Sequence, residues 1–288
     1  MEQPLFDILP PSNVKEQLKC LWHEAFGDSS EFIEAFFGNF PCDECAHTLS
    51  VGGRVVSVLY ALPCTLCVGG KEYAAAYIYA VATAADCRGR GYMQLLMERV
   101  ENLLRSRGVE FLYLQPADEG LRNYYSRLGY SNCSARGVTL LPCPQVEATA
   151  LHFKEVAFSR ELCDFCAVVQ CAVEPSVIHS PSFIAMNCFN CSAQGGGVFA
   201  VYGAGCVKAV AFVAVDGDGP LLLASFSASS LSFSFLLQSL CTRFGVAAIR
   251  LLEQGKGEPC CMSRIIGSRD FARQISLKEV NIPLLLDK

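Results

Sequence analysis

The sequence lacks an excess of positive charge. It contains 23 Lys and Arg residues against 28 Asp and Glu residues, which gives a formal net charge of −5. Proteins that bind nucleic acid through its phosphates usually carry a basic surface, so this balance argues against nucleic acid as a partner. A mild excess of acidic groups better suits a substrate that carries an amine.

A secretion signal and a long uninterrupted apolar run are also missing. The N-terminal segment MEQPLFDILPPSNV is acidic and broken by prolines, unlike a signal peptide. The most apolar stretch, residues 198–215, is interrupted by Gly203, Gly205 and Lys208, so we expect a β-hairpin there and not a membrane span. The sequence therefore predicts a soluble cytoplasmic protein with no membrane partner.

Cysteine is abundant, with 17 residues, and without a secretion signal we expect reduced thiols. Some Cys-X-X-Cys spacings permit a zinc site or thiol redox chemistry, which leaves a cysteine-based zinc or redox protein as an alternative. However, an odd spacing sends two thiols to opposite faces of a strand, and an i,i+3 spacing places them on one buried stripe of a helix. We therefore expect packed thiols and no metal. The four pairs are Cys42/Cys45, Cys64/Cys67, Cys163/Cys166 and Cys188/Cys191.

Local patterns predict a mixed series of helices and strands in the first half. Ser29 or Ser30 is expected to cap the second helix, and Gly69-Gly70 forms a hairpin turn. The segment LPCPQVEA, residues 141–148, indicates a domain boundary, which gives domains 1–143 and 144–288. The expected helices are 14–26, 30–38, 91–107 and 121–128, and the expected strands are 46–51, 54–62, 72–83, 109–114 and 135–141.

The second half shows a similar order of elements, which favours a duplicated domain over an unrelated second α/β domain. The segment CMSRIIG, residues 261–267, faintly echoes YYSRLGY, residues 124–130, and this echo aligns Met262 with Tyr125. The expected elements are strands at 198–202, 206–215, 221–226 and 247–252, and a helix at 231–244.

The most distinctive segment is ADCRGRGYMQLLMERVE, residues 85–101. A glycine-rich turn that leads into a helix N-terminus is a common way to hold a phosphate. Next come VEFLYLQ, residues 109–115, and LRNYYSRLGY, residues 121–130. The order strand, RGRG turn, helix, strand and YYSRLGY resembles the GNAT N-acetyltransferase family, and the resemblance covers roughly the first half of the chain.

The resemblance implies acetyl-CoA as co-substrate, and it implies a bulge that splays the strand before the turn from the following strand. The family often has Gln or Arg three residues before the first glycine, whereas this chain has Asp86, and we expect Arg88 and Arg90 to compensate. The residues assigned to acetyl-CoA are Val81 and Thr83, through backbone groups, and the pyrophosphate loop of Arg88, Gly89, Arg90, Gly91, Tyr92 and Met93.

The reaction implied is direct attack of an amine on the thioester, which requires a proton for the leaving thiolate. Tyr125 matches the family's tyrosine near the CoA sulfur and is the expected general acid, whereas Tyr124 is expected to pack. The general base stays open between a water chain, the C-terminal carboxylate of Lys288 and the acidic residues Glu72, Glu110 and Glu119. The four histidines, His23, His47, His152 and His179, are expected to be ordinary surface or packed residues.

Aromatic residues at helical spacing occupy the first two predicted helices. In the GNAT family this region usually walls the substrate pocket, but such spacing more often marks a core. Only an exposed member of the set would count as a pocket wall. The set is Trp22, Phe26, Phe32, Phe36 and Phe37.

The whole chain resembles tandem GNAT proteins, in which one half keeps the CoA loop and the other is degenerate. The second half has ASFSASSLSFSF, residues 224–235, where the loop would lie, with neither glycine nor arginine. We expect an α/β fold of two GNAT-like domains, each a twisted central sheet of mixed strands flanked by helices. We expect the acceptor to be a small-molecule or peptide amine, and the oligomeric state stays open. A non-catalytic acyl-CoA-binding or sensory protein is the main alternative.

Overall fold

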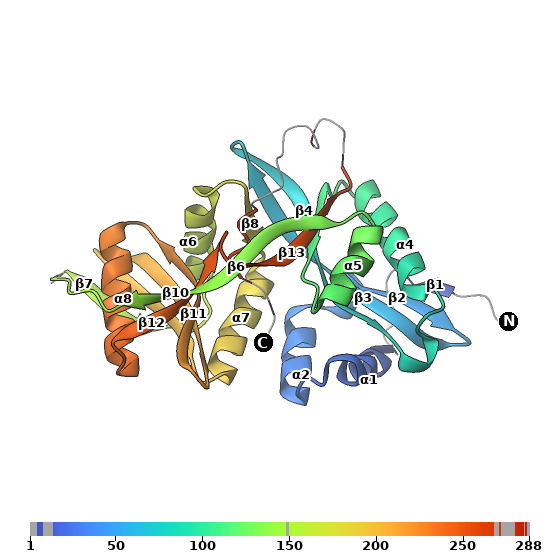
Figure 1. Ribbon diagram of the computed structural model, residues 1–288, viewed down its shortest axis with the longest axis horizontal. Coiled ribbons are helices and arrows are strands. Elements are labelled where there is room, and N and C mark those ends of the chain that lie inside the picture. The colour runs from blue at the N-terminus through green and yellow to red at the C-terminus, as the bar shows by residue number, and fades with distance from the viewer. Residues whose placement is uncertain are drawn as a thin grey trace. The chain divides into compact units, whose positions relative to one another are not determined.

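The computed structural model describes residues 5–7, 14–147, 150–267, 271, 280–284 and 286 (Figure 1). Within these residues the chain divides into two compact units. Unit 1 takes its residues from 1–66, 72–133 and 261–277, and unit 2 from 67–71, 134–260 and 278–288. No helix in the described part of the chain is both long and apolar enough to cross a membrane.

The helices and strands predicted from the sequence are present with similar bounds, and the pairs Cys163/Cys166 and Cys188/Cys191 lie on helices. Up to α5 the elements are β1 (Leu5–Asp7), α1 (Lys15–Phe26), α2 (Ser30–Asn39), α3 (Cys42–Cys45), β2 (Ala46–Val51), β3 (Arg54–Val68), β4 (Lys71–Thr83), the short 3-10 helix η2 (Ala85–Cys87), α4 (Tyr92–Ser106), β5 (Phe111–Leu114) and α5 (Glu119–Arg127). The rest are β6 (Ser131–Pro142), β7 (Leu151–Glu155), α6 (Arg160–Cys171), β8 (Ser176–His179), α7 (Pro181–Ala193), β9 (Gly197–Gly203), β10 (Cys206–Asp216), β11 (Gly219–Ser227), α8 (Ser230–Phe244), β12 (Ala248–Gln254) and β13 (Glu258–Ile265).

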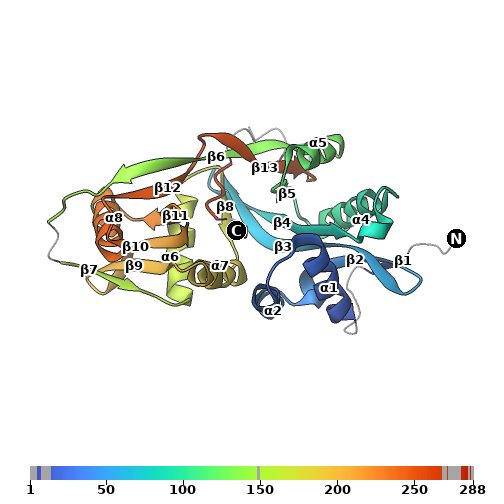
Figure 2. The same ribbon diagram turned by 60° about the horizontal axis from the view of Figure 1, so that its bottom comes forward.

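The sheet of unit 1 has the strand order β1-β2-β3-β4-β5-β13. Strands β4 and β5 are parallel, so the chain needs a crossover between them, and α4 supplies it. Figure 2 shows α1 and α2 on one side of this sheet and α4 on the other. Ser29 accepts a hydrogen bond from the Phe32 N–H, which confirms the predicted cap of α2.

The aromatic residues of α1 and α2 form the core of unit 1. Trp22 is 1% exposed, and its ring lies 4.6 Å from the ring of Phe36 and 5.2 Å from the ring of Tyr60. Phe32, Phe36 and Phe37 are also buried, so these residues pack and do not wall a pocket. Phe26 is the exception, with 44% of its surface exposed at the end of α1.

The sheet of unit 2 has the order β6-β12-β11-β10-β9-β7. Strands β9 and β10 form the predicted hairpin, and β11 and β12 run parallel with α8 as their crossover. Figure 1 shows α8 on one side of these strands and α6 and α7 on the other. The order β9-β10-β11-α8-β12 along the chain is the same as the order β2-β3-β4-α4-β5 in unit 1.

In each unit, the strand at one end of the strand order comes from a part of the chain that the predicted boundary assigns to the other domain. Most of β6 pairs with β12 in unit 2, although it directly follows α5, and β13 from near the end of the chain pairs with β5 in unit 1. The units therefore depart from the expected ranges 1–143 and 144–288. The expected echo between YYSRLGY and CMSRIIG is wrong, because Tyr125 lies in a helix whereas Met262 lies in β13 opposite Leu114.

Candidate acetyl-CoA site

Strands β4 and β5 separate before β4 ends. Their pairing runs from Ala75 opposite Phe111 to Tyr77 opposite Tyr113, and β4 then continues to Thr83 without β5. Ala80, in this stretch, has a φ of 44°, which is unusual for a residue with a Cβ and marks a break in the regular strand. The backbone groups of Val81 and Thr83 therefore lie in a part of β4 that β5 does not pair with.

The turn between β4 and α4 brings two glycines to the helix N-terminus. Gly89 and Gly91 have φ values of 75° and 77°, in the left-handed region that residues with a Cβ rarely adopt. Nothing lies within 4 Å of the place where a Cβ would stand at either residue, so the backbone is open to an approaching group. Gly91 is the N-cap of α4, offers no side chain to the first-turn N–H groups, and is followed by no acidic residue in that turn. This helix start is suited to an anion.

Arg88 and Arg90 fold back onto the same turn. The Nε of Arg88 donates to the carbonyl of Thr83 at 3.1 Å, and an Nη of Arg90 donates to the carbonyl of Asp86 at 3.0 Å. Both side chains are exposed. Each hydrogen bond uses one of the five N–H donors of a guanidinium, so both residues bring positive charge to the turn while they brace it.

Asp86 is neutralised by a residue that the sequence did not indicate. Arg54, the first residue of β3, donates to both carboxylate oxygens of Asp86 at 2.7 and 3.0 Å. This bidentate pairing lowers the pKa of Asp86 and raises the pKa of Arg54. Beside it, a carboxylate oxygen of Glu24 in α1 accepts the Ala85 N–H at 3.0 Å. Neither Arg54 nor Glu24 belongs to the quoted motif, and no local spacing pointed to them.

Tyr125 lies on α5, which Asp118 caps by accepting the Leu121 N–H at 2.7 Å. Its side chain is buried, and this burial raises the pKa of the phenol well above its ordinary value, with Tyr124 acting in the same direction. The phenol therefore keeps its proton at neutral pH, as a general acid must. Tyr124 packs edge-on against it at 5.3 Å between ring centroids.

The three acidic residues considered as general bases differ in their position relative to the turn after β4. Glu72 stands at the start of β4, about 35 Å of extended chain before Thr83. Glu110 directly precedes β5, where its N–H donates to Ala74, so both lie at the opposite strand ends from the turn. Glu119 follows the C-terminal end of β5 and pairs with Arg122 at 3.4 Å. Lys288 lies outside the described residues.

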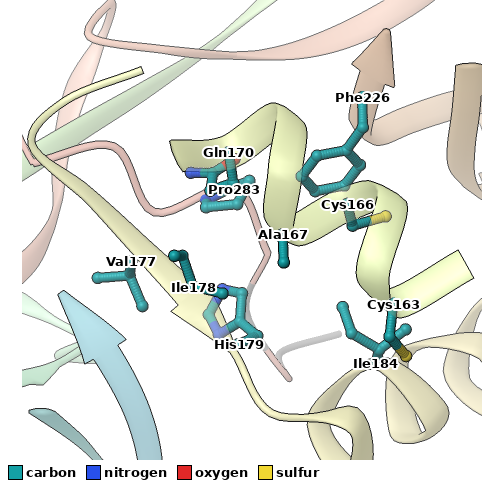
Figure 3. Close-up of a pocket in the computed structure, with 10 residues that line it drawn as sticks. All are labelled: Cys163, Cys166, Ala167, Gln170, Val177, Ile178, His179, Ile184, Phe226 and Pro283. Carbon is teal, nitrogen blue, oxygen red and sulfur yellow. The ribbon is translucent and has the colours of Figure 1, made fainter. Parts of the chain in front are cut away.

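The histidines divide as expected, with His23 and His152 exposed and His47 buried. His179 lines a cavity of about 10 Å³ in unit 2, together with Cys163 and Cys166. This volume accommodates about one water molecule, so the cavity cannot hold a cofactor. Figure 3 shows the imidazole well separated from both sulfur atoms, so these three groups do not converge as metal ligands.

Residues 12–133 match the family model described as an acetyltransferase (GNAT) domain. No curated protein matches the sequence.

Solved structures show the same fold over nearly the whole chain. A probable N-acyltransferase from Enterococcus faecalis has a TM-score of 0.76 at 16% identity, over 92% of this chain and 73% of that one. A GCN5-related N-acetyltransferase from Anabaena variabilis has a TM-score of 0.74 at 13% identity, with the same shares covered. N-myristoyltransferase from Saccharomyces cerevisiae, solved with myristoyl-CoA, has a TM-score of 0.57 at 10% identity, over 91% of this chain and 82% of that one. The mixed α/β fold predicted from the sequence is therefore confirmed.

Proposed function

We propose that the protein is an acetyl-CoA-dependent N-acetyltransferase that moves an acetyl group to an amine by direct attack on the thioester. The observation that carries this proposal is the separation of β4 from β5, continued by a turn with two left-handed glycines at the start of α4. The solved N-myristoyltransferase structure, which holds myristoyl-CoA, supports an acyl-CoA as ligand on this fold.

Each part of acetyl-CoA meets groups of suitable chemistry. The backbone N–H groups from Gly89 to Met93, with the charges of Arg88 and Arg90, hold the pyrophosphate. The stretch of β4 at Val81 and Thr83, which β5 does not pair with, offers backbone groups to the amides of the pantetheine arm. Tyr125 donates its proton to the leaving thiolate. Glu119 or a water chain takes the proton from the amine, which attacks in its neutral form.

In the corresponding turn of unit 2, side chains already occupy backbone N–H groups at the helix start. This supports acetyl-CoA binding by the first half alone. At the start of α8, the Ser229 hydroxyl accepts the Ser232 N–H, and the Ser232 hydroxyl accepts the Ser229 N–H, both at 3.2 Å. This capping box uses N–H groups that an anion would need. We propose that the second half is a degenerate copy within a tandem GNAT arrangement.

Thermal unfolding with and without acetyl-CoA tests the site. A ligand that binds only the folded state adds about 2.7 kcal/mol at roughly a hundredfold excess over its dissociation constant. Gly91→Glu places a negative charge at the proposed pyrophosphate site. Gly245→Glu is the matched control, because Gly245 is also a helix cap with a positive φ of 68° and nothing within 4 Å of its Cβ position. We expect the wild type and the Gly245 variant to be stabilised, and the Gly91 variant not to respond.

Turnover is measured next as release of the CoA thiol with polyamines, aminoglycosides, amino acids and peptides as acceptors. Acetylation of one class identifies the acceptor. Stabilisation by acetyl-CoA without thiol release from any of them would favour a non-catalytic acyl-CoA-binding protein. A folded wild type that acetyl-CoA does not stabilise would overturn the proposed site.

A further inference from the structure

Two thiols that are far apart in the sequence meet in unit 2. The Sγ of Cys67, near the end of β3, lies 3.6 Å from the Sγ of Cys171, the last residue of α6. Cys67 is 4% exposed, whereas Cys171 is half-buried. Cys64, the Cys-X-X-Cys partner of Cys67, lies three residues earlier on β3. This odd spacing points its side chain to the opposite face of the strand, away from the Cys67 thiol.

A second contact holds the same two segments together. The backbone N–H of Gly70, in the turn between β3 and β4, donates to the carboxylate of Glu174 at 2.9 Å, three residues beyond the end of α6. Residues 67–71 belong to unit 2 with α6, and Figure 1 shows the tip of the β3–β4 hairpin beside that helix. The Gly70–Glu174 hydrogen bond therefore helps packing to hold the two thiols near each other.

We propose that Cys67 and Cys171 are a reversible disulfide site that reacts with a low-molecular-weight disulfide of the glutathione class. A disulfide has an S–S length of about 2.05 Å, so the sulfur atoms need to approach by about 1.5 Å. The hairpin turn and the end of the helix are surface elements that can supply such a movement.

The reaction balances with oxidised glutathione as the oxidant. The thiolate of Cys171, the more accessible residue, attacks one glutathione sulfur, and the other glutathione leaves as a thiolate that takes up a proton. The thiolate of Cys67 then attacks the Cys171 sulfur and releases the second glutathione in the same way. Two protein thiols are oxidised, one disulfide is reduced, and both protons end on glutathione. The new bond joins residues 104 positions apart and fastens the β3–β4 turn to α6.

Peptide mapping of the full-length protein tests this proposal. The protein is incubated with oxidised or reduced glutathione, alkylated, digested without reduction and analysed by mass spectrometry. We expect a linked Cys67–Cys171 peptide only after oxidation, its loss on addition of reduced glutathione in excess, and a higher thermal midpoint for the oxidised protein. In Cys67→Ser we expect Cys171 to retain one glutathione.

Cys206→Ser is the control, since Cys206 is exposed in unit 2 and its removal leaves the proposed pair intact. Thermal midpoints in reducing buffer establish that every variant is folded. The proposal is overturned if folded wild type gains glutathione on exposed cysteines while Cys67 and Cys171 stay reduced. Linkage of either residue to a different cysteine would also overturn it.

Discussion

Arg54 holds both carboxylate oxygens of Asp86, 32 residues later in the chain, at 2.7 and 3.0 Å. Asp86 stands two residues before Arg88 and is the acidic residue in a turn that we assign to a pyrophosphate. Its negative charge would oppose that ligand, and the guanidinium of Arg54 cancels it. Arg54 therefore adds to the compensation that we expect from Arg88 and Arg90, which also hold the turn through backbone carbonyls.

Removal of Arg54 is expected to weaken acetyl-CoA binding. Arg54→Ala leaves Asp86 uncompensated beside the pyrophosphate, and we expect about a fivefold higher dissociation constant by titration calorimetry, with a smaller effect at high salt. The double variant Arg54→Ala/Asp86→Asn should recover most of the affinity. Arg250→Ala is the matched control, because Arg250 forms a similar bidentate pair with Asp216 in unit 2. Equal weakening by both arginine variants would contradict the assignment.

Tyr125→Phe is expected to lower kcat by about 10²–10⁴-fold, the usual contribution of a general acid, with little change in acetyl-CoA affinity. Tyr124→Phe serves as the neighbouring control. Because burial raises the pKa of Tyr125, the wild-type rate should show no loss from phenol deprotonation up to at least about pH 10, the ordinary tyrosine pKa. A Tyr125 variant with wild-type kcat would remove the residue from the mechanism.

The elements that local sequence patterns define were predicted, and the contacts between distant segments were not. The turn from Arg88 to Met93 was identified because glycine, arginine and a helix start are adjacent in the chain. The places of Arg54 and Glu24 beside it depend on how β3 and α1 pack, which no spacing in the sequence encodes. The same holds for β13, because an antiparallel strand can join any sheet edge with a suitable apolar face.

Arg264 of β13 stabilises unit 1 through an ion pair with α4. Its guanidinium lies 2.8 Å from a carboxylate oxygen of Glu101 in α4, whose other oxygen accepts the Tyr130 hydroxyl at 3.2 Å. Burial raises the pKa of Glu101 in spite of these partners. Arg264→Ala should lower the free energy of unfolding by about 2 kcal/mol at neutral pH, because it leaves a buried carboxylate without its counter-ion.

Denaturant unfolding at two pH values checks the cause of that loss. A raised pKa in the folded state means that the folded protein binds more protons than the unfolded one, so the stabilisation is complete at low pH and is lost as pH rises through the folded pKa. The deficit of Arg264→Ala should therefore shrink near pH 4.5, the ordinary value for Glu, where Glu101 takes up a proton. Arg264→Ala/Glu101→Gln should restore stability at neutral pH. A deficit that is independent of pH would point to lost packing instead.

His179 makes the stability of unit 2 fall as pH is lowered, which is opposite to the effect of Glu101 in unit 1. Its ring stacks on Phe183 with centroids 4.1 Å apart, and burial lowers its pKa from 6.5 to about 3, with the charge of Arg136 contributing. Between these two values the unfolded state binds a proton and the folded state does not, so stability falls as pH is lowered through this window. The loss approaches about 1.4 kcal/mol per pH unit.

His179→Phe should therefore be less sensitive than wild type to acid between pH 6 and pH 4 in urea unfolding. His152→Phe, which alters an exposed histidine on β7, should keep the wild-type slope. If both variants follow the wild-type slope, His179 is not the group that titrates.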